Sequence, residues 1–137
     1  MKKVLIILLL PLSIYAQTDP AEIDSAVYVM HEVVNKYRLL NNVNTLELDT
    51  MMCRLAQNHA IWMYNNEFKH SDLPYWENCT KHTGVSENFW RKSIKQSIMP
   101  KFYSLIYSPA HNTNMLNSRF YQAGYGFYRG MHVQLFN

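Results

Sequence analysis

The sequence predicts a single α+β domain behind an N-terminal signal peptide. Two stretches in the first half of the chain carry apolar residues at helical spacing. Two aromatic and apolar runs near the end, separated by Arg129-Gly130, are typical of a β-hairpin. No internal repeat, linker or low-complexity tract divides the 137 residues, which are a usual length for one domain. Helices followed by a hairpin therefore favour one α+β unit.

Residues 1–16 have the layout of a secretory signal peptide. Two lysines follow the first methionine, Val4 to Leu10 is an unbroken apolar run, and the stretch from Pro11 onward ends in the small residue Ala16. The apolar run is shorter than the roughly 20 residues that span a bilayer. We therefore expect cleavage after Ala16 rather than an uncleaved anchor. The domain at residues 17–137 is then secreted or periplasmic, with no transmembrane anchor.

Two helices are predicted before the middle of the chain. The first begins at Asp19 and ends near Leu40, and the second begins at the capping residue Asp49 and ends at Asn65-Asn66. The apolar face of the first helix comprises Val27, Met30, Val34, Tyr37 and Leu40. That of the second comprises Met52, Leu55, Ala56, Ala60 and Met63.

The second half contains shorter predicted elements. They are, in order, an irregular segment (68–84), a strand (85–90), a helix (93–107), a short helical piece after a turn (111–116) and the two hairpin strands (121–128 and 131–136). The irregular segment includes Tyr75 and Trp76. Their rings either pack in the core or line a groove for sugars, peptides or lipids.

The charge excludes a general nucleic-acid binder. Without the two lysines of the signal peptide, the 13 Lys and Arg fall to 11, against 10 Asp and Glu. Every carboxylate side chain lies between Asp19 and Glu87, whereas the chain from Asn88 onward has only basic charges. Either the two halves interleave and their charges mix, or a basic face meets acidic polymers or anionic lipid heads.

The chain has two cysteines, Cys53 and Cys79. An even number in an exported protein predicts a disulfide between them, with two free thiols as the alternative. A bridge of this loop length contributes roughly 3 to 4 kcal/mol in the chain-entropy model. Their spacing fits neither a metal nor a redox motif.

The histidines are candidate ligands, but their spacing alone identifies no site. None belongs to an H-E-x-x-H motif, and a single histidine is more often a surface or hydrogen-bonded residue than a ligand. The six are His31, His59, His70, His82, His111 and His132.

Four stretches form an ordered pattern of motifs. They are Asn35-Lys36-Tyr37-Arg38, continued by Leu46 to Asp49 and Leu55 to Ala60; His70-Ser71; Ser86-Glu87-Asn88; and Ser108 to Asn117, continued by the G-x-G-F of Gly124 to Phe127. Together they resemble the CAP superfamily of SCP-like extracellular domains, which includes cysteine-rich secretory proteins, plant pathogenesis-related class 1 proteins and short bacterial secreted proteins. The resemblance extends from Val27 to Phe136, nearly the whole mature chain.

This resemblance implies an α-β-α sandwich with a central, mainly antiparallel sheet and a cleft where histidines and glutamates converge. It assigns His70 and His111 as ligands of a divalent cation such as zinc, with water in the open positions. Glu87 is the tentative catalytic group, which either orients one imidazole or accepts a proton from metal-bound water. Asn88 and Ser108 are further cleft residues.

The sequence also departs from the family pattern. No acid follows Glu87, so the second cleft glutamate of animal and plant members is absent, and Ser108 stands at the matching place. Glu77-Asn78 is a competing Glu-Asn pair, although the spacing to His111 favours Glu87. In the plainest alternative, Glu87 and Asn88 only connect loops by hydrogen bonds.

Three functions remain open at this stage. The first is an extracellular binding module whose ligand is a protein, a cell-wall polymer or a lipid. The second is a metal-assisted hydrolase of the peptidase type, which uses His70, His111 and Glu87 and against which the missing carboxylate counts. The third is sterol or fatty-acid binding, which requires an apolar pocket between helices. Whether the protein is an enzyme is left undecided.

Overall fold

The computed structural model describes residues 25–72, 85–92 and 97–137. The predicted signal peptide and the start of the first helix lie outside these ranges. The same holds for several singled-out side chains: Tyr75, Trp76, Glu77, Asn78, Cys79 and His82.

The described residues form a four-stranded sheet with the order β1-β3-β4-β2. Its strands are β1 (Glu47–Leu48), β2 (Ser86–Arg91), β3 (Gln122–Tyr128) and β4 (Met131–Phe136). The short β1 pairs with β3 in parallel, while β3 with β4 and β4 with β2 are antiparallel. The sheet is therefore mainly antiparallel, as predicted, and β2 lies at its edge.

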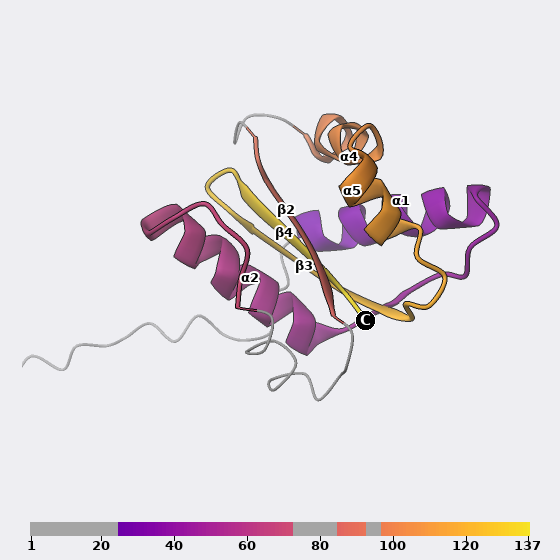
Figure 1. Cartoon of the computed structure of the whole chain (residues 1–137), viewed down its shortest axis with the longest axis horizontal. Coiled ribbons are helices and arrows are strands. Elements are labelled where there is room, and N and C mark those ends of the chain that lie inside the picture. Colours follow the sequence, from indigo (N-terminus) through magenta and orange to yellow (C-terminus); the bar gives the residue numbers. More distant parts are fainter. Residues whose placement is uncertain (1–24, 73–84, 93–96) are drawn as a thin grey trace, which may run out of the picture.

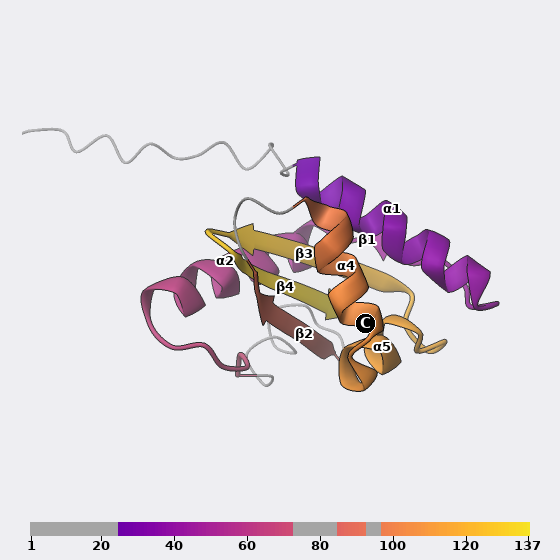
Figure 2. The ribbon, with the colours of Figure 1, turned by 90° about the horizontal axis from the view of Figure 1, so that it is seen from above.

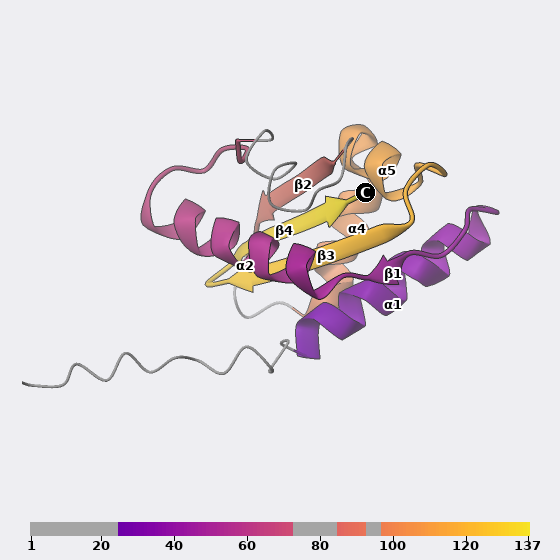
Figure 3. The same ribbon diagram turned by 90° about the horizontal axis from the view of Figure 1, so that it is seen from below.

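Helices cover both faces of the sheet. Among the helices that the structure describes, α2 (Thr50–Asn65) is the one that lies against one face (Figure 1). The opposite face is covered by α1 (Ser25–Leu40), α4 (Ile98–Ile106) and α5 (Pro109–Met115). Figures 2 and 3 show the three layers from above and below. This arrangement confirms the α-β-α sandwich.

Strand β4 shows how the sheet serves two cores. Every residue of this strand is buried, because both of its faces are covered. Val133 and Leu135 pack with residues of α2, whereas Phe136 packs with residues of α1, α4 and α5. Alternate side chains of a strand point to opposite faces, so one strand contributes to both cores.

Helix α2 approaches β3 so closely that only glycine fits between them. A Cβ added to Gly124 would lie 2.3 Å from the backbone carbon of Met52, and one added to Gly126 would lie 2.2 Å from that of Ala56. Real Cβ atoms do not approach a backbone so closely. The G-x-G spacing in β3 thus determines how near α2 packs to the sheet.

The predicted face of the second helix is confirmed. Asp49 caps α2, because its Oδ1 accepts a hydrogen bond from the backbone N–H of Met52 at 2.8 Å. The five apolar residues assigned to this face are all buried.

Two details of the other helices were predicted wrongly. Leu40 is 83% exposed, because the buried stripe of α1 continues through Val34 to Arg38, and Leu40 lies about 200° further around the helix. Helix α5 begins at Pro109 rather than at His111, since proline fits the first helical position.

Cys53 is buried in the core beside Tyr125, and burial raises the pKa of its thiol. Its proposed partner Cys79 lies outside the described residues, so the disulfide stays a prediction. Of the helices in the described ranges, none has both the length and the apolar character needed to cross a membrane.

Candidate functional site

The candidate site is built around β2, the edge strand. Successive side chains of a strand point to opposite faces. Glu87 therefore faces the side of α2, and Asn88 faces the side of α5. The segment after α2 and the start of α5 approach this edge from the two faces, which brings His70 and His111 toward the same strand.

Glu87 is a buried carboxylate whose side chain is 1% exposed. Its Oε1 accepts hydrogen bonds from His70 Nδ1 at 2.9 Å and from the Ser71 backbone N–H at 3.0 Å. The Ser71 hydroxyl donates to Oε2 at 2.5 Å. The carboxylate thus holds the His70-Ser71 segment against the sheet, as a buried charge requires.

His59 is a member of this cluster that the sequence analysis did not assign. Its Nε2 lies 3.8 Å from Glu87 Oε2 and 3.1 Å from the Lys69 carbonyl oxygen. Burial lowers the pKa of His59, although Glu87 and the carbonyl act in the opposite direction. At neutral pH the ring is therefore neutral and donates its Nε2–H to this carbonyl. A signal was available, because His59 occupies a position on the apolar face of α2 and a buried imidazole needs a polar partner.

His111 is held from the other face of the sheet. Burial lowers its pKa, the backbone carbonyl of Phe89 opposes this effect by hydrogen bonding, and the charge of His70 lowers the pKa further. The backbone carbonyl of His111 accepts from Asn88 Nδ2 at 3.0 Å. Asn88 also donates to Gln134 at 3.0 Å and accepts from Asn114 at 2.9 Å.

The two candidate ligands thus lie close enough for the charge of His70 to lower the pKa of His111. The side chain of His70 is 65% exposed, and its ring packs edge-on against that of Phe89 with centroids 4.4 Å apart. Glu87 engages Nδ1 of His70, which leaves Nε2 for another partner. No group of three or more His, Cys, Asp or Glu residues within the described ranges is arranged to hold a metal ion.

Ser108 is not part of this cluster. It caps α5 through its backbone, where its carbonyl accepts from the N–H of Asn112 at 2.9 Å, and its hydroxyl caps no helical N–H. The position that the resemblance matches to the second glutamate therefore has a helix-capping role here.

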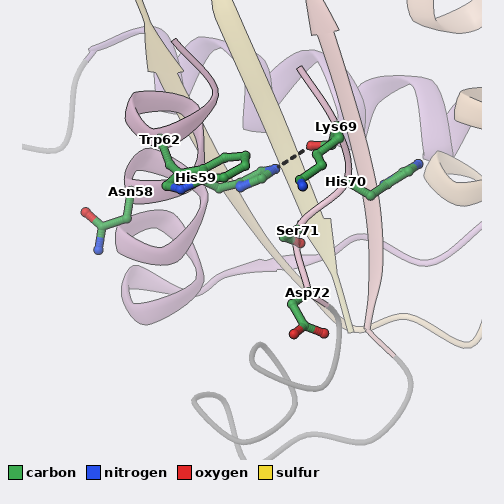
Figure 4. A pocket seen from close by; sticks show the side chains of 7 residues that line it. All are labelled: Asn58, His59, Trp62, Lys69, His70, Ser71 and Asp72. Atoms are coloured by element: carbon green, nitrogen blue, oxygen red, sulfur yellow. Dashed lines mark hydrogen bonds between the residues drawn. The ribbon is translucent and has the colours of Figure 1, made fainter. Parts of the chain in front are cut away.

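A pocket of about 380 Å³ adjoins the carboxylate cluster on the side of α2 (Figure 4). Trp62 and His59 line it from the helix and stack with ring centroids 5.8 Å apart. The ammonium of Lys69 lies 5.4 Å from the Trp62 ring centroid. In Figure 4 the His70 ring points away from these two rings, although His70 also lines the pocket. The other lining residues are Asn58, Ser71 and Asp72.

Comparisons with solved structures find the same fold in bacterial proteins. A cysteine-rich secretory protein from Staphylococcus aureus matches with a TM-score of 0.71 and 18% identity, over 81% of this chain and 37% of that chain. An extracellular protein containing an SCP domain from Bacillus anthracis gives 0.73 and 21%, over 81% and 39%. An outer surface protein from Borrelia burgdorferi gives 0.69 and 18%, over 83% and 94%. This chain spans well under half of the first two proteins and nearly all of the third.

No sequence among the curated proteins matches this chain. The family model of the cysteine-rich secretory proteins matches residues 31–136, which is most of the chain. This range contains both faces of the sheet and every residue of the carboxylate cluster. The chain therefore belongs to the cysteine-rich secretory protein family, the CAP family.

Proposed function

We propose that the protein is an exported binding module in which His70 and His111 hold a divalent cation such as zinc at the edge of the sheet. The observation that carries this proposal is that each imidazole has a hydrogen-bond partner at one of its two nitrogens. One nitrogen of His70 is engaged by the Glu87 carboxylate, and His111 is engaged by the Phe89 carbonyl. Histidines that bind metals are usually held in this way, which leaves the other nitrogen for the ion.

The charge state of the site favours cation binding. Burial and the neighbouring His70 lower the pKa of His111, so its imidazole is neutral at pH 7 and keeps a lone pair for a metal. Two protein ligands are one fewer than in a usual catalytic zinc site. We therefore expect weak, reversible occupancy with several water ligands.

The hydrolase alternative has less support. A general base must reach the proton that it removes, but Glu87 is buried and both of its oxygens accept hydrogen bonds from His70 or Ser71. The chain beyond Glu87 has no other carboxylate side chain to take this role. The contacts favour a positioning role for Glu87 and a cation that contributes to ligand binding.

The ligand is expected outside the cell, as a protein, a cell-wall polymer or a lipid. Two observations support export: the signal-like residues 1–16, and structural relatives described as an extracellular protein and an outer surface protein. The pocket beside Trp62 is a second contact area for such a ligand. Sterol or fatty-acid binding stays a prediction.

Zinc titration by calorimetry on residues 17–137 tests the cation site. We expect weak binding that disappears in the His70→Ala/His111→Ala variant and is retained in His31→Gln, which changes a histidine of α1 away from the cleft. Absence of binding in the unmutated protein, or equal binding in the double variant, would contradict the proposal. Circular dichroism of each variant checks that the fold is kept.

A further inference from the structure

One end of the sheet gathers basic side chains that the cation site does not use. We call Arg91, Lys92 and Arg129 the basic tip. Arg91 is the last residue of β2 and pairs with Met131 of β4, which in turn pairs with Tyr128 of β3. Neighbouring strands are about 4.8 Å apart, so the Cα atoms of Arg91 and Tyr128 are roughly 10 Å apart. The end of α2 and the β3–β4 turn lie at this same end of the molecule (Figures 1, 2 and 3).

Aromatic rings position both arginines of the tip. The guanidinium carbon of Arg129 lies 5.3 Å from the Tyr64 ring centroid and 5.6 Å from that of Tyr128. Arg129 also donates to the Tyr64 hydroxyl at 3.3 Å. The guanidinium of Arg91 lies 5.0 Å from the Phe68 centroid. These contacts restrict each side chain and leave most of its five N–H donors for an acceptor.

The tip is not neutralised within the described ranges. No carboxylate there forms an ion pair with its three cations, and Glu67, which precedes Phe68, pairs with Lys69 at 3.0 Å instead. Arg91, Lys92 and Arg129 are all exposed. The sequence left two interpretations of its uneven charge: the acidic and basic halves mix in space, or they form a basic face. This end of the molecule favours the basic face.

Arg129 also has an unfavourable backbone conformation. Its φ is 45°, and Gly130 follows with a φ of 87°. A turn with two positive φ values strongly prefers Asn, Asp or Gly at its first position. An arginine there costs folding free energy, because its Cβ crowds the following carbonyl oxygen. An unfavourable residue whose side chain is ordered on two aromatic rings indicates a role other than stability.

We propose that the basic tip binds a phosphate-bearing polymer outside the cell. Arginine pairs with phosphate through two parallel hydrogen bonds, and two arginines at the same end of the sheet suit repeated anions along one chain. A bilayer fits less well, because membrane anchoring requires apolar side chains that are free to enter the acyl boundary. Here the rings of Tyr64 and Phe68 already contact guanidinium groups.

Long-chain inorganic polyphosphate is the probe, and its affinity for residues 17–137 is measured at several salt concentrations. This fragment contains every described residue. We expect Arg91→Gln/Arg129→Gln to weaken binding at least about tenfold and to reduce the salt dependence, since each phosphate contact releases counterions. The matched control, Arg54→Gln/Arg119→Gln, removes two exposed arginines elsewhere with the same charge change. Equal loss in both variants would overturn the proposal, because net charge alone would then explain binding.

A second variant separates binding from folding. Arg129→Asn places a favoured residue in the turn, so we expect its melting temperature to equal or exceed that of the unmutated protein while polyphosphate binding falls. Unchanged binding by this stable variant would contradict a role for Arg129.

Two further arms test the ligand class. Binding to polyglutamate as tight as to polyphosphate would overturn the assignment to phosphate. Arginine-dependent binding to phosphatidylglycerol vesicles without polyphosphate binding would replace the polymer with a membrane surface. Neither arm involves His70 or His111, so this inference stands or fails independently of the cation site.

Discussion

Glu87 shows how one buried carboxylate organises the candidate site. It receives hydrogen bonds from a ring nitrogen, a backbone N–H and a hydroxyl, all supplied by His70 and Ser71. No arginine or lysine among the described residues pairs with it. Its charge is therefore compensated by donors that also determine the direction in which the His70 ring points.

Replacement of Glu87 by Gln tests this positioning role. The amide keeps the shape but loses the charge that orients Nδ1–H, so we expect zinc affinity to fall by about 10- to 100-fold. Calorimetry measures the affinity, and circular dichroism checks the fold. Glu67→Gln changes an exposed carboxylate on the same segment and should leave zinc affinity unaltered. Unchanged affinity in Glu87→Gln would show that His70 needs no such support.

His132 is a buried histidine on the opposite face of the sheet from Glu87. Its ring stacks on Trp90 with centroids 5.0 Å apart and packs edge-on against Phe127. Neither ring nitrogen has a hydrogen-bond partner among the described residues. Burial, and secondarily the charge of Lys101, lowers the pKa of His132 to about 3.

This shift predicts that stability falls in acid. The ordinary pKa of 6.5 applies to the unfolded chain, which binds a proton below that pH while the folded protein does not. The His132 contribution is therefore fully present above pH 6.5 and is lost as the pH falls toward 3. At pH 5 the loss is roughly 2 kcal/mol.

Urea denaturation between pH 7.5 and about 4 measures the effect of His132. The His132→Phe variant keeps a ring in the same place but cannot titrate, so its stability should depend less on pH. Some dependence remains, because burial also lowers the pKa of His59 and His111. Identical pH curves for the two proteins would refute the assignment to His132.

At the scale of elements, the contact between α2 and β3 positions the site. Gly124 and Gly126 allow the helix backbone to lie directly on the strand. His59 lies one turn beyond Leu55 and two turns beyond Met52 on the same buried face, and it thereby comes within reach of Glu87. The helix–strand spacing thus controls both the core and the carboxylate cluster.

Substitution of Gly126 by Ala should destabilise this contact. The added methyl would meet backbone atoms of Ala56 and Gln57, which cannot move aside as a flexible side chain can. We expect a loss of about 1 to 3 kcal/mol or more in the free energy of unfolding. Chemical denaturation measures it, with Met51→Ala on the exposed side of α2 as a control within about 0.5 kcal/mol of the parent. A loss no larger than that of the control would show that α2 can shift freely.

At the scale of the whole molecule, Arg38 connects distant parts of the chain. This residue of α1 is fully buried. Its guanidinium donates to the carbonyl oxygens of Asn44 at 2.6 Å, Met115 at 2.7 Å, Asn117 at 3.1 Å and Phe120 at 3.2 Å. It thereby fixes the connection from α5 to β3 against the first helix, which explains the arginine of the N-x-x-R motif.

Lysine at position 38 is not expected to make the hydrogen bonds of Arg38. Its ammonium lacks the planar fork that reaches several carbonyls at once, and unsatisfied buried acceptors cost about 1 to 3 kcal/mol each. We expect Arg38→Lys to lose more than about 2 kcal/mol in a denaturation experiment. The control is Arg119→Lys, an exchange at an exposed position. Equal stability of both variants would exclude this role for Arg38.

Much of the fold could be predicted because local signals mark its elements. The cap at Asp49, the apolar spacing along α2 and the Arg129-Gly130 turn each depend on neighbours in the sequence. The ordered motifs led to the family and to His70, His111 and Glu87 as candidate site residues, but they did not show which imidazole Glu87 contacts. Leu40 was misassigned, because apolar spacing does not reveal that a buried arginine continues the stripe.

Local sequence patterns were enough to predict most of the elements, the family and the candidate residues on β2 and beside it. The folded arrangement was needed to show that β2 is an edge strand, that His59 reaches Glu87 and that Arg91 and Arg129 share one end of the sheet. These relations join residues 28 or more positions apart in the chain. Their proximity follows from strand order and from the packing of α2, which local spacing cannot specify.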